Sequence, residues 1–335
     1  MKKAPPTDIQ IYGAAALLQH LGSLLTEAPG VTVAQDIECI HRMRVASRRL
    51  RAALAIFEPH LPRKRAARWQ EQVRALTKAL GAARDADVQI EWVRAFYQNL
   101  PAGPDRPGAR RLLLRLQQQR QALQPRVHRT LSRFEKSGTA LSLTQTLSPP
   151  ANLKTEQFAP GNTIYQWAEQ WIIQRLDEFL AFAPFIAQPE AQKELHAMRI
   201  AGKRLRYTLE IFAELYPDAL KRPLQTLRKA QDLLGQIHDD DVWQMTLPEL
   251  LAQERQRTLE YYGTLRPFNR LQPGMLAFAQ HCHEDRTAAY AELVNAWADW
   301  ENRQIWTALR QSVTTPAPED PPHEPTSDPS PAADA

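Results

Sequence analysis

The sequence predicts an all-α fold, and three observations support this prediction. Long stretches rich in Ala, Leu, Arg, Gln and Glu have apolar residues three or four positions apart, and alternating β-branched runs and Asn-Gly hairpin turns are missing. An eleven-residue motif also occurs twice. We therefore expect an internal duplication that forms two four-helix bundles, related by a pseudo-twofold axis, around a basic central groove or pore.

The apolar periodicity gives the expected helices in order. The first half predicts helices over 10–27, 33–59, 63–81, 84–99 and 107–135. The second half predicts helices over 162–183, 189–215, 218–236, 239–264 and 274–311. The chain is thus expected to comprise a flexible N-terminus (1–9), a first bundle (10–136), a linker (137–161), a second bundle (162–311) and a tail (312–335).

The linker and the tail are predicted from their composition. Residues 137–161 contain three Pro, many Ser and Thr and little charge, which is typical of a linker or long surface loop. Residues 312–335 contain seven Pro and few large apolar side chains. Such a tail cannot bury enough surface to become ordered, so we expect it to be disordered.

The charge of the chain favours a polyanionic partner. The net charge of the 335 residues is +5, but residues 312–335 hold five acids and no Lys or Arg, so residues 1–311 carry +10. Nucleic acid, an acidic membrane surface and inorganic polyphosphate would all suit this charge. Cys39 and Cys282 form no disulfide framework, and the apolar stretch 14–18 is too short for a signal peptide or a membrane span. These features predict a cytoplasmic protein without membrane contact.

The repeated motif is specific. The segment His41-Arg-Met-Arg-Val-Ala-Ser-Arg-Arg-Leu-Arg51 returns as His196-Ala-Met-Arg-Ile-Ala-Gly-Lys-Arg-Leu-Arg206, with seven of eleven positions identical. Farther along, Gly81-Ala-Ala-Arg-Asp-Ala-Asp-Val88 matches Gly235-Gln-Ile-His-Asp-Asp-Asp-Val242. Two matches in the same order are not expected by chance, and they indicate two copies of one helical unit.

The motif has one basic face when it is helical. At about 100° per residue, four basic side chains fall together in each copy, opposite a stripe of Met, Leu and Phe. The members are His41, Arg44, Arg48 and Arg51 in the first copy and His196, Arg199, Lys203 and Arg206 in the second. Arg49 and Arg204 lie at the flank, and Arg74 and Arg228 belong to neighbouring helices, so these four are further candidates.

Such a face suits an extended phosphate-rich anion. Each copy spans about 15 Å of helix, arginine can hold two phosphate oxygens at once, and a bound phosphate would raise the pKa of the two histidines. The competing interpretation is a solvated face, or ion pairs between helices that involve the acidic clusters Asp85, Asp87, Asp239, Asp240 and Asp241.

The two copies, each followed by Gly-x-x-[Arg/His]-Asp-x-Asp-Val, resemble the CHAD domain, the conserved histidine α-helical domain, over about residues 10–311. The resemblance implies two pseudo-symmetric four-helix bundles around a basic cavity that binds inorganic polyphosphate, often at polyphosphate granules. Phosphate or sulfate ions would occupy the same groove. The implied binding residues are His41, Arg44, Arg48, Arg49, Arg51, His196, Arg199, Lys203, Arg204 and Arg206. The Glu-x-Glu-x-Lys motif of the CYTH domain, which often precedes CHAD, is absent.

Three other functions compete with polyphosphate binding. A metal site is disfavoured because His281 and His283 point apart on a helix, and a hydrolase is disfavoured because no nucleophile elbow or phosphate loop is visible. We therefore expect no cofactor, no metal and no catalytic residue. RNA binding is the strongest rival, and weak nucleic-acid binding is expected, but only Tyr207 adjoins the basic face as a stacking group would.

Overall fold

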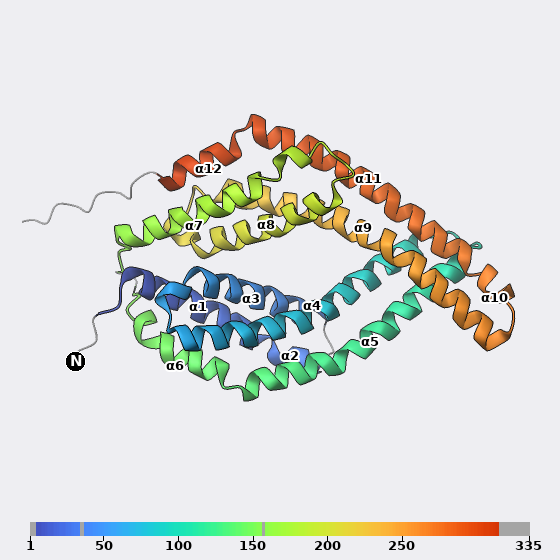
Figure 1. Cartoon of the computed structure of the whole chain (residues 1–335), viewed down its shortest axis with the longest axis horizontal. Coiled ribbons are helices and arrows are strands. Elements are labelled where there is room, and N and C mark those ends of the chain that lie inside the picture. Colours follow the sequence, from blue (N-terminus) through green and yellow to red (C-terminus); the bar gives the residue numbers. More distant parts are fainter. Residues whose placement is uncertain (1–4, 34–36, 156–157, 315–335) are drawn as a thin grey trace, which may run out of the picture.

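The computed structural model describes residues 5–33, 37–155 and 158–314, and all regular elements in these ranges are helical, which confirms the predicted all-α class (Figure 1). The first half contains α1 (Asp8–Thr26), α2 (Ala28–Val33), α3 (Ile37–Ile56), α4 (Arg63–Asn99), α5 (Arg106–Lys136) and α6 (Thr139–Ala151). The second half contains α7 (Asn162–Leu180), α8 (Gln192–Ile211), α9 (Lys221–Tyr262), α10 (Arg266–Asn269), α11 (Gln272–Asn302) and α12 (Ile305–Thr314). Three short 3-10 turns are η1 (Glu58–His60), η2 (Ala183–Phe185) and η3 (Ala213–Leu215).

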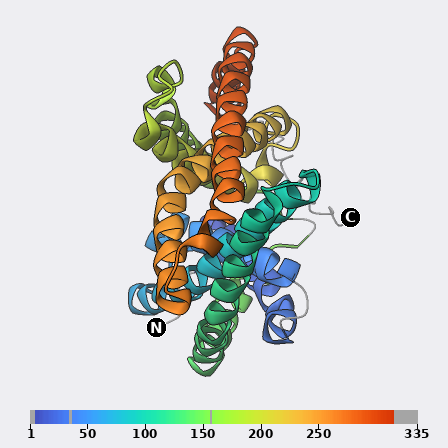
Figure 2. The same cartoon turned by 90° about the vertical axis from the view of Figure 1, so that its right-hand side faces the viewer.

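Two long helix pairs extend from a broader base. Helix α4 packs against α5 and α9 packs against α11, and both pairs reach the right-hand side of Figure 1. At the base, α1, α3 and α6 form a lower layer, and α7, α8 and α12 form an upper layer. Figure 2 looks onto the far ends of the long pairs, where α5 packs against α11.

The main hydrophobic core joins the two halves at the base. It contains Leu17 and Met43 from the first half and Met198 and Phe212 from the second, all fully buried. At the junction the Tyr12 hydroxyl donates a hydrogen bond to the carbonyl oxygen of Ile211 at 2.8 Å. The base is therefore one continuous core.

A second core holds the long helix pairs together. Its buried side chains come from all four long helices, namely Ile90, Val93, Leu112, Leu116, Trp243, Leu247, Leu250, Met275, Phe278 and Cys282. The rings of Trp243 and Phe278 lie edge to face with centroids 5.0 Å apart. Both cores draw on both halves, so the two halves share one packed interior. Their arrangement as two bundles related by a pseudo-twofold axis stays a prediction.

The long pairs also meet through backbone contact. Gly108 lies in the first turn of α5 and Gly274 lies in the first turn of α11, and each directly follows a proline. A Cβ on Gly108 would overlap the carbonyl oxygen of Leu271, and one on Gly274 would overlap that of Asp105. Only glycine permits the two helix starts to approach this closely.

Several helix boundaries differ from the sequence prediction. Helices α4 and α9 continue through 82–83 and 237–238, where the sequence predicted breaks, and the nearby Gly81 and Gly235 weaken each helix without ending it. The predicted helix over 274–311 is instead divided into α11 and α12 near Gln304, whose φ of 51° is left-handed.

The segment 137–161, predicted to be a linker or long surface loop, contains a helix. Residues 139–151 form α6, which packs on α1 and buries Leu143 and Leu147 one turn apart. Their i,i+4 spacing outweighs the Ser, Thr and Pro content, since both internal prolines lie in the last turn. Of the other predicted segments, the N-terminus 1–9 includes the start of α1, which Thr7 caps, and the tail 312–335 includes the end of α12. Residues 1–4 and 315–335 lie outside the described residues.

Among the described helices, none has both the length and the apolar character that a membrane span requires.

Candidate anion-binding site

The eight residues of the predicted basic stripe lie on two helices that pack against each other, α3 and α8. Their opposite faces are core, where Met43, Leu50, Met198 and Leu205 are fully buried. We call the eight residues the basic face: His41, Arg44, Arg48, Arg51, His196, Arg199, Lys203 and Arg206. The helical-wheel prediction of an apolar and a cationic side is therefore correct for both helices.

The basic residues of α3 and α8 act on one another electrostatically. The pKa of Lys203 on α8 is lowered to about 7, first by burial and then by positive charges on Arg199, Arg48 and Arg44. Burial also lowers the pKa of Arg44, and Arg48 and Arg199 contribute to this shift. Positive charges from the two halves thus form one cluster, although the structure does not by itself define a central groove or pore around it.

Acidic residues hold the central arginine of each copy. Arg44 Nη2 lies 3.1 Å from Asp85 Oδ1 on α4, and Arg199 Nη2 lies 3.9 Å from Asp239 Oδ1 on α9. The ion-pair interpretation is therefore correct for these two arginines. A single carboxylate occupies only part of a guanidinium group, which has five N–H donors, so each pair leaves donors for a further anion.

Buried nitrogen atoms in the basic face have no hydrogen-bond partner among the described residues. They include Nε of Arg44 and Nε of Arg199, which are equivalent positions, and Nδ1 of His41 and of His196. An unpaired buried donor costs about 1–3 kcal/mol. The basic face thus holds buried polar atoms that the protein itself leaves unsatisfied.

The histidines of the basic face are held in the neutral form. Burial lowers the pKa of His41 and of His196, and nearby arginines add to the effect. The ring of His196 lies 4.1 Å from the ring of His238, whose pKa burial lowers to about 4. The sequence analysis did not single out His238 as a site residue, although it occupies the variable position of the Gly-x-x-[Arg/His] segment, where the first copy has Arg84.

The flanking candidates have different surroundings. Arg49 Nε donates a hydrogen bond to Glu210 Oε2 at 2.8 Å, and Arg206 forms an ion pair with the same carboxylate at 3.5 Å. Glu210, which the sequence analysis missed, thus ties Arg49 on α3 to α8. The predicted assignment of Arg49 as a ligand-binding residue competes with this ion pair.

The remaining candidates are exposed. Arg74 on α4 contributes to lowering the pKa of Arg51, after burial, and so lies at the end of the basic face. Arg204 and Arg228 are exposed, and neither has an ion pair within the described part of the chain. The structure brings Arg74 to the cluster and gives no contact that does so for Arg204 or Arg228.

The last aspartate of each acidic cluster, Asp87 or Asp241, joins two helices. Asp87 Oδ1 accepts a hydrogen bond from Arg120 Nε at 2.7 Å, and Asp241 Oδ1 accepts one from Arg286 Nε at 2.6 Å. These buried pairs tie α4 to α5 and α9 to α11. No group of three or more His, Cys, Asp or Glu side chains within the described ranges is arranged to hold a metal ion.

Asp240 differs from its neighbours. It is fully buried, and neither carboxylate oxygen has a hydrogen-bond partner among the residues described. Burial, together with the charges of Asp285, Asp239 and Asp241, raises its pKa to about 8. Asp240 is therefore mainly neutral at pH 7 and unsuited to metal binding in that form.

Comparison with known proteins places the chain in a family. A family model described as CHAD domain matches residues 15–248, a range that contains both copies of the motif. A solved structure described as the CHAD domain from the plant Ricinus communis is 24% identical, covers 93% of each chain and has a TM-score of 0.60. PptA from Streptomyces chartreusis is 17% identical over 88% of this chain and 99% of that chain, with a TM-score of 0.58.

No curated protein matches this chain, and no CYTH domain is detected in it. At these identities the two solved structures show a shared fold. The CHAD family is associated with polyphosphate binding. Because the family model spans more than half of its length, the chain belongs to the CHAD family.

Proposed function

We propose that this chain binds inorganic polyphosphate, without cleaving it, through the basic face of α3 and α8. The observation that carries this proposal is the convergence of Arg44, Arg48, Arg199 and Lys203 from two helices into one positive cluster. Like charges held this close oppose folding, and a bound polyanion offsets their repulsion.

The chemistry of the donors favours phosphate. The guanidinium groups offer planar pairs of N–H donors that match phosphate oxygens, and Lys203 supplies a point charge. The guanidinium groups of Arg44 and Arg199, which occupy equivalent positions in the two copies, give the ligand two equivalent anchors. An extended chain of phosphates can reach both, whereas one small anion satisfies only one end of the face.

The surroundings of the acidic residues support binding rather than hydrolysis. Metal-assisted phosphate cleavage needs carboxylates that are free to hold a metal ion. Asp85 and Asp239 instead pair with arginines of the basic face, and Asp87 and Asp241 pair with arginines of α5 and α11. A polyphosphate hydrolase remains the enzymatic alternative and predicts that the chain shortens in the presence of Mg²⁺ or Mn²⁺.

A titration of the full chain with long-chain polyphosphate and with length-matched single-stranded RNA tests the proposal. At six to eight engaged phosphates, the log–log dependence of affinity on salt should have a slope of roughly −4 to −6. Polyphosphate should bind more tightly than RNA, and its length on a gel should be unchanged after incubation with Mg²⁺ or Mn²⁺. Shortened polyphosphate, or stronger binding of RNA, would contradict the proposal.

Paired variants locate the site. Arg44→Gln/Arg199→Gln removes two charged anchors and should weaken polyphosphate binding at least about 100-fold, at 1.5–3 kcal/mol for each charged hydrogen bond. The matched control is Arg126→Gln/Arg129→Gln, which removes the same charge from two exposed positions on α5. Circular dichroism checks that both variants fold. Equal losses in the two variants would show binding by net charge alone.

Cellular location follows from the same proposal. A protein that binds polyphosphate in the cytoplasm should gather on polyphosphate granules. A fluorescent fusion of the full chain should therefore colocalise with a polyphosphate stain, and the Arg44→Gln/Arg199→Gln variant should be diffuse. Granule association that persists in this variant would assign targeting to another surface.

A further inference from the structure

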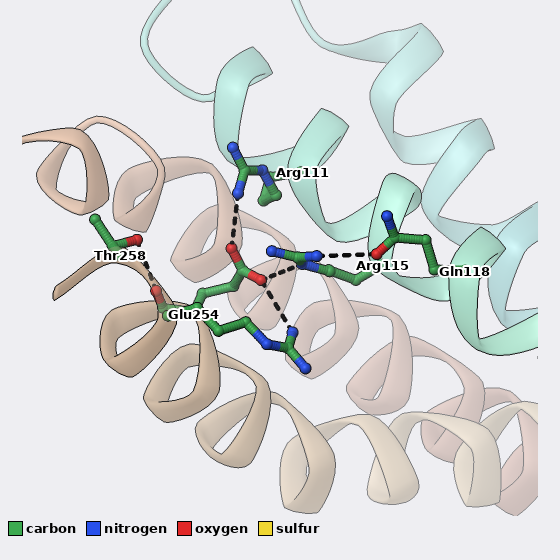
Figure 3. Close-up of polar contacts among 6 residues, drawn as sticks. Arg111, Arg115, Gln118, Glu254 and Thr258 are labelled. Carbon is green, nitrogen blue, oxygen red and sulfur yellow. Dashed lines mark hydrogen bonds and ion pairs between the residues drawn. The ribbon is translucent and has the colours of Figure 1, made fainter. Parts of the chain in front are cut away.

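A second group of arginines surrounds a buried carboxylate far from the basic face, on the long helices α5 and α9. Glu254 on α9 is buried and accepts hydrogen bonds from Arg111, Arg115 and Arg257, the first at 3.0 Å and the last at 3.3 Å (Figure 3). Burial would raise the pKa of Glu254, but hydrogen bonds and charges from the arginines outweigh it and lower the pKa. Glu254 is therefore ionised and fixes all three guanidinium groups.

One carboxylate does not neutralise three arginines. The side chains of Arg111 and Arg257 remain 33% and 49% exposed, so each keeps N–H donors that face solvent. Both line a cavity of about 440 Å³ between α5 and the end of α9, together with Arg115 and Glu260. Counting both glutamates, the cavity has a net charge of +1.

Two exposed aromatic rings complete this cavity. Tyr261 and Tyr262 lie at the end of α9, with exposed fractions of 82% and 57% and ring centroids 4.8 Å apart. Neither ring belongs to either hydrophobic core. Large aromatic side chains at this exposure contribute little to folding, and their flat faces are free for a planar ligand.

An adjoining cavity extends the same pattern along α5. It has a volume of about 680 Å³, shares Arg111 and adds Arg106, Arg110 and Tyr97. The Arg106 guanidinium lies 4.4 Å from the centre of the Tyr97 ring, a cation–π contact. Arginines and aromatic rings thus line both cavities, and the added residues raise the net charge to +3.

We infer that these two cavities form a nucleotide-binding surface, separate from the basic face, that stacks a base on Tyr261 or Tyr262 and holds its phosphate with Arg111 and Arg257. Single-stranded nucleic acids are bound by this combination of aromatic platforms and cationic side chains. Polyphosphate has no ring and gains nothing from the tyrosines. The ligand is a phosphorylated nucleoside unit, either free or within single-stranded RNA.

Binding of AMP, of fluorescently labelled oligoadenylate and of polyphosphate to the full chain tests this inference. Tyr261→Ala/Tyr262→Ala should weaken oligoadenylate binding about tenfold or more, since stacking is worth about 1–3 kcal/mol per base, and should leave polyphosphate binding unchanged. Tighter binding of oligoadenylate than of AMP would identify RNA as the source, and the reverse would identify free nucleotides.

Two further variants separate this surface from the basic face. Arg257→Gln should weaken oligoadenylate binding and reduce its salt dependence, whereas Arg129→Gln, a charge change elsewhere in the chain, should not. The basic-face variant Arg44→Gln/Arg199→Gln should retain oligoadenylate binding that depends on the tyrosines. The inference is overturned if the tyrosine variant binds oligoadenylate normally, or if the basic-face variant alone abolishes that binding. The test measures oligoadenylate binding, so it stays valid even if the protein does not bind polyphosphate.

Discussion

Gly81 on α4 lies against the guanidinium group of Arg44 on α3, and a Cβ added at Gly81 would stand 3.7 Å from the Nε atom. Gly235 on α9 has the same relation to Arg199, at 3.8 Å. In both copies, the central arginine therefore packs against a glycine of the next helix, where no side chain is present. A methyl group fits at either position in ordinary van der Waals contact, whereas a longer side chain would displace the guanidinium group.

Gly81→Ala and Gly235→Ala should each stabilise the protein by about 0.5–1 kcal/mol, because alanine in a helix loses less conformational entropy than glycine. Polyphosphate affinity should be unchanged in both, and urea denaturation and titration measure the two quantities. Gly81→Leu is the contrasting variant and should weaken binding by moving Arg44. A destabilised Gly81→Ala variant would show that the space between Gly81 and Arg44 is too small for a methyl group.

Polyphosphate affinity should fall as the pH rises from 7 to 9. The free protein has a Lys203 pKa of about 7, and a bound polyanion raises that pKa, so the complex holds a proton that the free protein loses above pH 7. The affinity then decreases by at most tenfold per pH unit in this window. Isothermal titration in buffers of different ionisation enthalpy measures the proton uptake directly.

Lys203→Arg is the control for this pH dependence. Arginine keeps the charge throughout the window, so the variant should bind well at pH 9 and show a nearly flat profile from pH 7 to 9. In the free protein, burial lowers the pKa of both histidines, and any slope left in Lys203→Arg measures protons that they take up beside the bound polyanion. An undiminished slope in Lys203→Arg would assign the proton uptake to another group.

Asp240→Ala should stabilise the protein at pH 8. The pKa of Asp240 is about 8 in the folded protein and about 3.8 when unfolded, so the unfolded chain releases this proton first and the folding free energy weakens between pH 4 and 8. Alanine, which the first copy has as Ala86, removes this effect, worth on the order of a few kcal/mol. Urea denaturation should show that Asp240→Ala raises the free energy of unfolding more at pH 8 than at pH 4.5. Equal increases at the two pH values would mean that the substitution acts through packing and not through the charge of Asp240.

Asp241→Ala should destabilise the protein by about 3 kcal/mol, because it leaves the buried guanidinium of Arg286 without its carboxylate. Asp87→Ala should act likewise through Arg120. Polyphosphate should bind both variants at a temperature where they are folded. The double variant Asp241→Ala/Arg286→Ala should recover part of the loss, and denaturation of the unchanged protein, Asp241→Ala, Arg286→Ala and the double variant completes a double-mutant cycle. A stable Asp241→Ala variant that no longer binds would instead make Asp241 part of the site.

Helical periodicity predicted which side of each motif helix faces the core, because burial repeats with the helix turn itself. Met43 and Leu50 are buried where the wheel placed them. Periodicity does not say which helices meet, so the sharing of both cores by both halves was not predictable. Helix α6 was missed because Ser, Thr and Pro content was given more weight than the pair Leu143 and Leu147.

The candidate site was predicted as a set of charges but not as a set of contacts. Arg49 looked equivalent to the other basic residues, yet its partner Glu210 lies 161 positions away in the chain. The binding roles of the twelve candidate residues and the origin of the two copies by duplication stay predictions. The grouping of arginines and tyrosines between α5 and α9 has no signature in sequence order, since it forms only where Arg111 meets the end of α9.

The glycine contact between the starts of α5 and α11 has a consequence for how the protein comes apart. The first turns of α5 and α11 pack directly against each other. Both hydrophobic cores contain side chains from the first and the second half of the chain. Neither half can melt while the other stays intact. Denaturation should therefore be a single cooperative transition, and a chain cut between α6 and α7 should fold only when both fragments are present together.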